Sequence, residues 1–112
     1  MDKNKRNLYE GMYAISAALS DEQRQRVIDE IQSEITQHGG EVLKIHSQGR
    51  KRMAYEINGQ REANYYVIYF EVSPEAISPM WREYRLNTNI LRFVTCRTEK
   101  VLDEIKFKPI GE

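Results

Sequence analysis

The residues of this sequence that are best suited to chemistry are cationic. Arg50, Lys51 and Arg52 follow one another, and Tyr55 stands three positions later. Arginine and lysine neutralise phosphates, and the flat guanidinium of arginine also stacks on nucleic-acid bases. The pattern therefore favours an anionic partner such as a nucleic acid.

The sequence contains no pattern typical of catalysis or metal binding. His38 stands at the end of a predicted helix, His46 stands within a predicted strand, and neither has a nearby ligand pair. The single cysteine, Cys96, excludes an internal disulfide and every cysteine-pair metal motif. A nucleophile elbow, a phosphate-binding glycine loop and paired carboxylates are all missing. We therefore expect no enzymatic activity, no bound metal and no cofactor.

Length and composition indicate one globular domain. The chain has 112 residues, of which 40% are hydrophobic and 30% are charged, and disordered chains have fewer apolar residues. No apolar run approaches the roughly 20 residues that cross a bilayer, and no signal-peptide pattern follows the charged N-terminus. A single cysteine is consistent with a reducing compartment. We expect a cytoplasmic protein.

The charges of the chain cancel but are segregated along it. Residues 20–41 carry six acidic residues against two arginines, whereas residues 44–61 carry five basic residues against Glu56 alone. This asymmetry is consistent with a local basic patch on a neutral molecule. The alternative is two solvated faces of opposite sign.

The elements that position these residues begin with a strand and a helix. Apolar and polar residues alternate over residues 9–16, which predicts a strand. Ser20 and Gln23 have the spacing of a capping box at the start of a helix. Gly39 and Gly40 predict its end. An apolar stripe between these signals indicates the buried face of the helix: Val27, Ile28, Ile31 and Ile35.

Residues 41–70 predict a hairpin of two strands. From Glu41 to Ile57 the hydrophobic period is two, with a basic interruption at Gly49 that indicates a bulge or bend. We predict a polar loop over residues 58–64. The run from Tyr65 to Phe70 is apolar on both faces, which is typical of a central strand.

A second helix and a last strand complete the domain. Ser73-Pro74 and Ser78-Pro79 are two possible helix starts, and Pro79 should bend the helix if the first is used. Residues 90–98 predict the last strand, with Phe93 facing opposite to Arg92. We expect a single domain over residues 1–98 and an irregular C-terminal tail over residues 99–112.

The element order strand–helix–strand–strand–helix–strand predicts a ferredoxin-like α+β fold. We expect a four-stranded antiparallel sheet in the order 4-1-3-2, with both helices on one face and the other face uncovered. Aromatic residues on the third strand would then meet a protein partner or fill the core. The core beneath the helices is predicted to contain Tyr13, Ile15, Ile28, Ile31, Ile35, Ile57, Ile77, Met80 and Phe93.

The stretch from Gly49 to Asn58 resembles the signature of the bacterial small-subunit ribosomal protein six family. That signature has a glycine, basic residues, Leu-Ala-Tyr, one free position and Ile, and here Met53 takes the place of Leu. The resemblance extends to Tyr9-Glu10, to the paired glycines after the first helix, to the tyrosine-rich third strand and to Asn89-Ile90. It covers the chain from about residue 8 to residue 98. Pro79, inside the second helix, departs from the family pattern.

The resemblance implies a function. Members of this family belong to the small ribosomal subunit, pair with the eighteenth protein of that subunit and bind small-subunit (16S) ribosomal RNA with it. A chain without surplus charge suits shared RNA binding, because phosphate contacts dominate affinity for RNA. Other ferredoxin-like proteins are RNA-recognition modules, metabolite sensors or dimeric oxygenases. This chain lacks the aromatic motif of the first class and a ligand pocket signal of the others.

We predict that Arg50, Lys51, Arg52, Arg92 and Arg97 contribute to the surface that binds RNA and the protein partner. The basic run interrupts an otherwise apolar pattern, so its charges should face outward. The alternative is that some of these arginines only neutralise acidic residues on neighbouring strands, namely Glu10, Glu41, Glu56 or Glu71.

Overall fold

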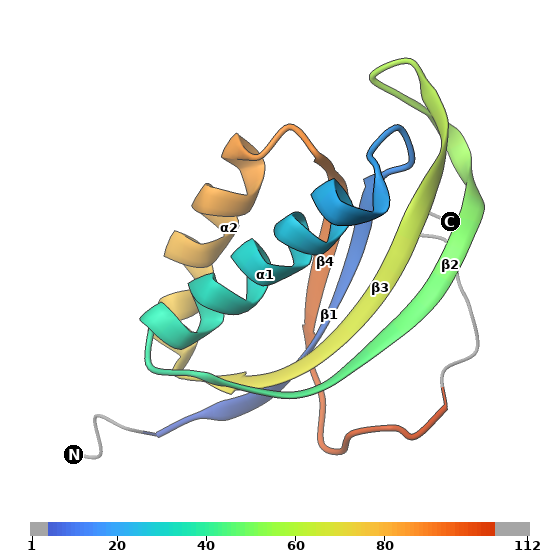
Figure 1. Cartoon of the computed structure of the whole chain (residues 1–112). Coiled ribbons are helices and arrows are strands. Elements are labelled where there is room, and N and C mark those ends of the chain that lie inside the picture. Colours follow the sequence, from blue (N-terminus) through green and yellow to red (C-terminus); the bar gives the residue numbers. More distant parts are fainter. Residues whose placement is uncertain (1–4, 105–112) are drawn as a thin grey trace.

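The computed structural model describes residues 5–104 and contains four strands and two α-helices in the order strand–helix–strand–strand–helix–strand (Figure 1). A short 3₁₀ turn precedes the second helix. The elements are β1 (Asn7–Ser16), α1 (Asp21–Gln37), β2 (Glu41–Ile57), β3 (Gln60–Val72), η1 (Pro74–Ala76), α2 (Ile77–Leu86) and β4 (Ile90–Arg97). No helix in this described part is both long and apolar enough to cross a membrane.

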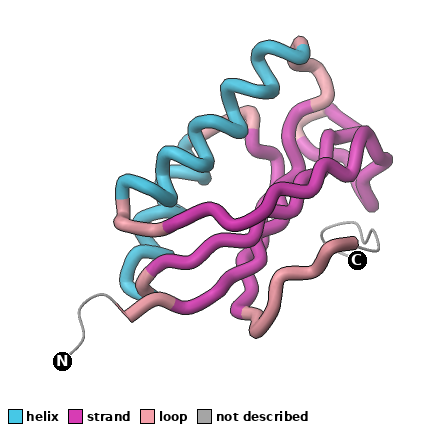
Figure 2. The backbone as a smooth tube through the Cα atoms, turned by 60° about the horizontal axis from the view of Figure 1, so that its bottom comes forward, coloured by secondary structure: helices cyan, strands magenta, loops and turns pink. Residues whose placement is uncertain are grey.

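The strands form one antiparallel sheet in the order β2-β3-β1-β4. Read from the other edge, this is the predicted order 4-1-3-2. Both helices lie on the same face of the sheet (Figures 1 and 2). The ferredoxin-like prediction is therefore confirmed.

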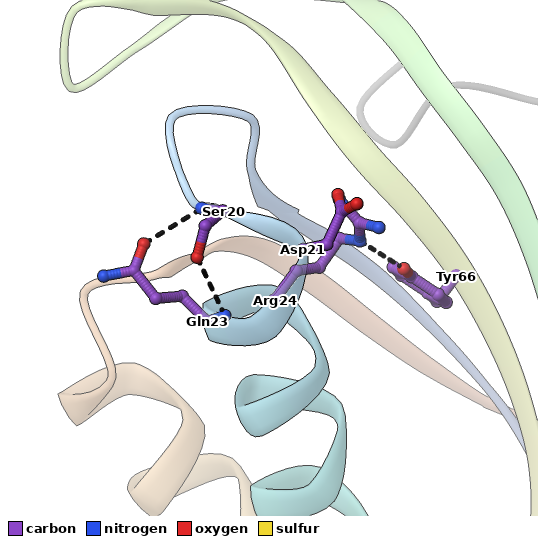
Figure 3. A network of polar contacts seen from close by, with 5 residues as sticks. All are labelled: Ser20, Asp21, Gln23, Arg24 and Tyr66. Atoms are coloured by element: carbon purple, nitrogen blue, oxygen red, sulfur yellow. Dashed lines mark hydrogen bonds and ion pairs between the residues drawn. The ribbon is translucent and has the colours of Figure 1, made fainter.

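Sequence signals set both ends of α1. The Ser20 hydroxyl accepts the Gln23 backbone N–H at 3.2 Å, and the Gln23 side chain accepts the Ser20 N–H at 2.9 Å (Figure 3). This is the predicted capping box. Gly39 ends the helix with φ +77°, and the Gly40 N–H returns to the Ile35 carbonyl at 2.9 Å. The pattern is a Schellman stop, which glycine adopts without steric cost.

The start of the second helix combines the two possibilities that the sequence left open. The chain begins to coil at Pro74, in the 3₁₀ turn, and becomes α-helical at Ile77. Pro79 is the third residue of α2 and stands in its first turn. Backbone N–H groups there lack intrahelical partners, so a proline is tolerated.

The main core lies between the sheet and the helices. Tyr13, Ile15 and Met80 are buried in it with the α1 stripe of Val27, Ile28, Ile31 and Ile35, while Ile77 and Phe93 are partly buried and pack against it. The prediction of Ile57 in this core was wrong. Ile57 packs on the opposite face of the sheet, because the register of the β2–β3 pair shifts between Arg52 and Ile57.

The hairpin between β2 and β3 is longer than predicted. The predicted loop over residues 58–64 contains a turn of only two residues, Asn58 and Gly59, with φ values of +49° and +78°. Such values are typical of the type I′ turn that joins strands tightly. The prediction failed because residues 60–64 are mostly polar and pair with β2 beyond the cover of the helices.

The sheet face away from the helices is partly covered, contrary to the prediction of an open face. Met53 and Ile57, near the end of β2, pack with Ala14 of β1 and with Tyr65. The far end of the hairpin therefore folds across the sheet instead of continuing flat (Figure 2). Tyr65 is only 2% exposed, so it fills a core and is not displayed to a partner.

A second cover on this face is the irregular segment of residues 98–104, called here the C-terminal segment. It runs from β4 to β2, where the Leu102 carbonyl lies 2.8 Å from His46 Nε2 and Asp103 lies 3.1 Å from Lys44 Nζ. Tyr69 and Val67 of the intervening β3 are 0% and 2% exposed. Residues 105–112 of the predicted tail lie outside the described residues.

Candidate nucleic-acid interface

The basic run lies on the outer half of the hairpin, beyond the bulge at Gly49. Arg50, Lys51 and Arg52 pair with Asn64, Ala63 and Glu62 of β3. Successive side chains of a strand point to opposite faces. Arg50 and Arg52 therefore share one face of the hairpin, and Lys51 lies on the other. All three residues are exposed.

Arg50 and Arg52 line a hollow of about 500 Å³ at the end of the sheet. Arg61 of β3 and Ala17, in the connection from β1 to α1, also line it. The other lining residues are Gln60 and Glu62. We call this the basic hollow.

Arg61 was not among the predicted site residues. In sequence it falls within the predicted polar loop over residues 58–64. Its place in the basic hollow follows from the two-residue turn, which makes Gln60 the first residue of β3. The Asn-Gly dipeptide, read as a tight turn, is the signal that could have found it.

One carboxylate partly offsets the three guanidinium groups. Arg50 Nε donates to Glu62 Oε1 at 2.7 Å, and both side chains are about half exposed to solvent. Exposed pairs of this kind contribute about 0–1 kcal/mol. With three arginines and one glutamate, the described residues that line the basic hollow carry a net charge of +2. Glu62 is not among the acidic residues that the alternative sequence interpretation named.

Ordered contacts hold the wall of the basic hollow in place. The Ser16 hydroxyl, at the end of β1, donates to the Gln60 side chain at 2.8 Å, and Ser16 is 3% exposed. On α1, the Arg24 guanidinium donates to the Tyr66 hydroxyl of β3 at 2.9 Å and pairs with Asp21 at 3.0 Å (Figure 3). The helix start and the sheet are thereby fixed relative to each other.

Arg92 is half-buried on the face away from the helices, as the alternation of β4 predicts. Its guanidinium lies over the Tyr55 ring, 5.4 Å from the ring centre, and donates to the Tyr55 hydroxyl. The structure thus brings Arg92 to the folded-over end of β2, near the basic run but not into the basic hollow.

Arg97 lies apart from the other predicted residues. It is the last residue of β4 and pairs with Tyr9, at the end of the sheet opposite the hairpin turn. Eight strand residues span on the order of 20 Å. The five predicted residues therefore do not form one continuous patch.

The sequence profile described as Ribosomal protein S6 matches residues 8–97 of this chain. The small ribosomal subunit protein bS6 of Protochlamydia amoebophila is 53% identical over 112 residues, covering 100% of this chain and 98% of the relative. The corresponding protein of Chlamydia muridarum is 50% identical, with 100% of each chain covered.

The chain belongs to the ribosomal protein S6 family. A crystal structure of 30S ribosomal protein S6 from Thermotoga maritima has the same fold, with a TM-score of 0.78 and 28% identity over 84% of this chain and 89% of that chain. S6 proteins are cytoplasmic components of the small ribosomal subunit, and they form a family of structural proteins, not of enzymes. The resemblance carried by residues 49–58 is confirmed.

The two histidines of this S6-family chain have local partners. His38 Nε2 lies 3.4 Å from Glu34 one helical turn earlier, and His46 contacts the C-terminal segment. Cys96 is exposed. Within residues 5–104, no three histidine, cysteine, aspartate or glutamate side chains gather where they could hold a metal ion.

Proposed function

We propose that this S6-family chain binds small-subunit ribosomal RNA jointly with the eighteenth protein of that subunit, and that it catalyses no reaction. The basic hollow is the observation that carries the proposal. Arg50, Arg52 and Arg61 line a space of about 500 Å³ there, with Glu62 as the one carboxylate among the described lining residues. Guanidinium groups bind phosphate oxygens in a bidentate manner, so the backbone of RNA suits this site.

The charge of the whole chain supports shared binding. Seventeen basic and seventeen acidic residues give a formal net charge of zero. Affinity for RNA comes largely from phosphate contacts and the release of counterions. A neutral protein with one basic hollow binds RNA weakly alone, and a partner that contacts the same RNA adds to the affinity.

The predicted residues divide between roles in this proposal. Arg50 and Arg52 contact phosphates from within the basic hollow, and Lys51 contacts RNA or the partner from the other face of the hairpin. Arg92 lies nearby, against Tyr55. Arg97, at the opposite end of the sheet, contacts the protein partner or a separate part of the RNA.

A salt series tests the proposal. The full-length chain, with its ribosomal partner present, is bound to the central-domain fragment of small-subunit RNA at increasing salt concentrations. We expect Arg50→Ala, Arg52→Ala and Arg61→Ala each to weaken binding and to reduce the slope of log affinity against log salt by nearly one unit. Arg26→Ala, an exposed arginine on α1 outside the hollow, is the matched control.

Glu62→Gln gives an independent check in the opposite direction. Because it removes the carboxylate that pairs with Arg50, it should raise RNA affinity while lowering stability slightly. If the arginine variants and Glu62→Gln leave affinity and slope at the level of Arg26→Ala, the basic hollow does not bind RNA.

A further inference from the structure

A second hollow lies beside the edge strand β4, between it and α2. It encloses about 590 Å³ and is reached by Trp81 and Arg85 of α2, by Arg92 and Phe93 of β4, and by Asn58 of the hairpin turn. We call it the α2–β4 groove. Since β4 is an edge strand, no further strand within residues 5–104 covers it.

The Trp81 ring forms the aromatic wall of this groove. Its indole N–H donates to the Thr95 hydroxyl at 3.0 Å, and the ring lies 6.1 Å from the Phe93 ring, centre to centre. The polar edge of the indole is thus occupied and its orientation fixed. The ring is half-buried and lines the groove.

Cationic groups accompany this aromatic wall. The guanidinium of Arg85 lies 5.9 Å from the centre of the Trp81 ring, one helical turn further along α2. Arg92 of β4 also lines the groove, although its guanidinium lies over Tyr55, and no carboxylate of residues 5–104 lines it. Asn58 adds an amide that can both donate and accept hydrogen bonds. An aromatic face, arginines and an amide together suit a nucleobase with its phosphate.

The α2–β4 groove and the basic hollow meet at the same hairpin turn. Asn58 lines the groove, and Gln60, two residues later, lines the basic hollow. An RNA strand whose phosphates occupy the hollow can therefore continue around the turn to the groove. This continuity favours RNA over an extended peptide paired to the edge of β4. The charge of the groove favours RNA as well, because arginines without carboxylates select an anionic ligand.

We propose that the α2–β4 groove binds an unpaired nucleotide of RNA, with the base stacked against Trp81 and the phosphate near Arg85. The inference rests on RNA binding by this chain and adds which part of the RNA is bound. It requires an accessible base face, so an unpaired nucleotide binds and a base-paired one does not.

Trp81 reports on this site directly, because it is the only tryptophan of the chain. Tryptophan fluorescence of the full-length protein is measured during titration with single-stranded oligoadenylate RNA and with a duplex RNA of equal length. We expect the single strand to quench the fluorescence and the duplex to leave it unchanged. Labelled-RNA anisotropy should show about a tenfold loss of single-strand affinity in Trp81→Ala and a smaller loss in Trp81→Phe.

Controls separate this inference from the proposed function. Arg85→Ala should weaken binding of the single strand, whereas Arg26→Ala should not, and thermal unfolding identifies any variant that fails to fold.

If Arg50→Ala and Arg52→Ala reduce the salt slope but neither RNA changes the fluorescence, the proposed function stands and the inference fails. If the ribosomal protein partner quenches Trp81 in the absence of RNA and RNA does not, the groove binds protein and the inference also fails. Quenching that persists when the variants of the basic hollow have no effect supports the groove and contradicts the hollow.

Discussion

Arg92 of β4 lies over the ring of Tyr55 of β2, although β4 and β2 form opposite edges of the sheet. The contact exists because the end of β2 folds across β3 and β1 on the face away from the helices. Met53 of the same strand is 7% exposed and packs against Ala14 of β1. The contact between Arg92 and Tyr55 thus joins the curled end of the hairpin to the edge strand β4.

Removing either partner should loosen this closure. We expect Tyr55→Ala and Arg92→Ala each to lower the free energy of unfolding by about 0.5–1 kcal/mol, the size of a partly exposed cation–π contact. Urea denaturation of both single variants and the double variant measures the coupling between the two side chains. Tyr55→Phe, which keeps the ring, should retain most of the coupling energy with Arg92. Strictly additive effects would mean that the contact contributes no energy.

The capping box of α1 gives a prediction at the helix start. Ser20→Ala removes the acceptor for the Gln23 N–H and should cost about 1 kcal/mol of stability. Ser20→Asp restores an acceptor and should recover most of this loss. Ser33→Ala, at an exposed position within the same helix, is the matched control and should be nearly neutral. If Ser20→Ala and Ser33→Ala lose equal stability in thermal unfolding, Ser20 does not act as a helix cap.

The two glycines after α1 should differ sharply in their tolerance of a side chain. A Cβ at Gly40 would lie 2.5 Å from the Glu71 carbonyl and 2.9 Å from the Ile35 carbonyl, so the backbone would have to move. We expect Gly40→Ala to cost about 2–3 kcal/mol, within the range for overpacked sites. At Gly39 a Cβ meets nothing within 4 Å, and only the φ of +77° opposes it. Gly39→Ala should therefore cost about 1–2 kcal/mol. A larger loss of stability for Gly39→Ala than for Gly40→Ala in urea denaturation would show that the close contacts at Gly40 are not the dominant cost.

Tyr69 makes the stability of the chain sensitive to alkaline pH. Burial, and next the hydrogen bond and charge of Glu10, raise the pKa of Tyr69 from 10.0 to about 12, against a backbone hydrogen bond with Leu102 that lowers it. A raised pKa in the folded state means that the folded protein holds the proton more tightly. The stabilisation is therefore complete below pH 10 and is lost as the pH rises to about 12.

Absorbance titration of tyrosinate, compared between the wild type and Tyr69→Phe, measures this pKa. Burial also raises the pKa values of Tyr13 and Tyr84, so the comparison of the two proteins is needed to isolate Tyr69. A chain ending at Arg97 lacks Leu102, whose backbone hydrogen bond lowers the Tyr69 pKa, and also loses the cover of the C-terminal segment. Because burial has the larger effect on this pKa, we expect the pKa to fall. A rise would mean that the hydrogen bond of Leu102 outweighs the burial that the segment provides.

The sequence predicted the elements that carry strong local signals. Ser20, Gln23 and Gly39 act within a few residues of themselves, and the structure confirms the helix ends that they indicate. The hydrophobic periods predicted the strands of the main core and hence the sheet order. Residues 60–64 are predicted as a loop because they are mostly polar and show no apolar period. They form a strand through their pairing with β2 in the hairpin.

The arrangement of the candidate site was beyond sequence reasoning because it depends on bends and distant contacts. Alternation places Arg50 and Arg52 on one face of the hairpin, but it does not predict that Arg61 of β3 also lines the basic hollow. The contact between Arg92 and Tyr55 joins residues 37 positions apart across two intervening strands. Periodicity along one strand carries no information on such a fold-over.

The central position of β1 has a consequence for how this chain folds while it is made. The strand is complete at Ser16, but its two neighbours in the sheet end at Val72 and at Arg97 of a 112-residue chain. Closing such long loops costs entropy before any pairing is gained, whereas the β2–β3 hairpin, joined by two residues, forms locally within microseconds. During synthesis we therefore expect the hairpin to form first. β1 can then pair with β3, but its other edge stays unpaired until β4 has left the ribosome. Chains released early expose that edge and aggregate through it.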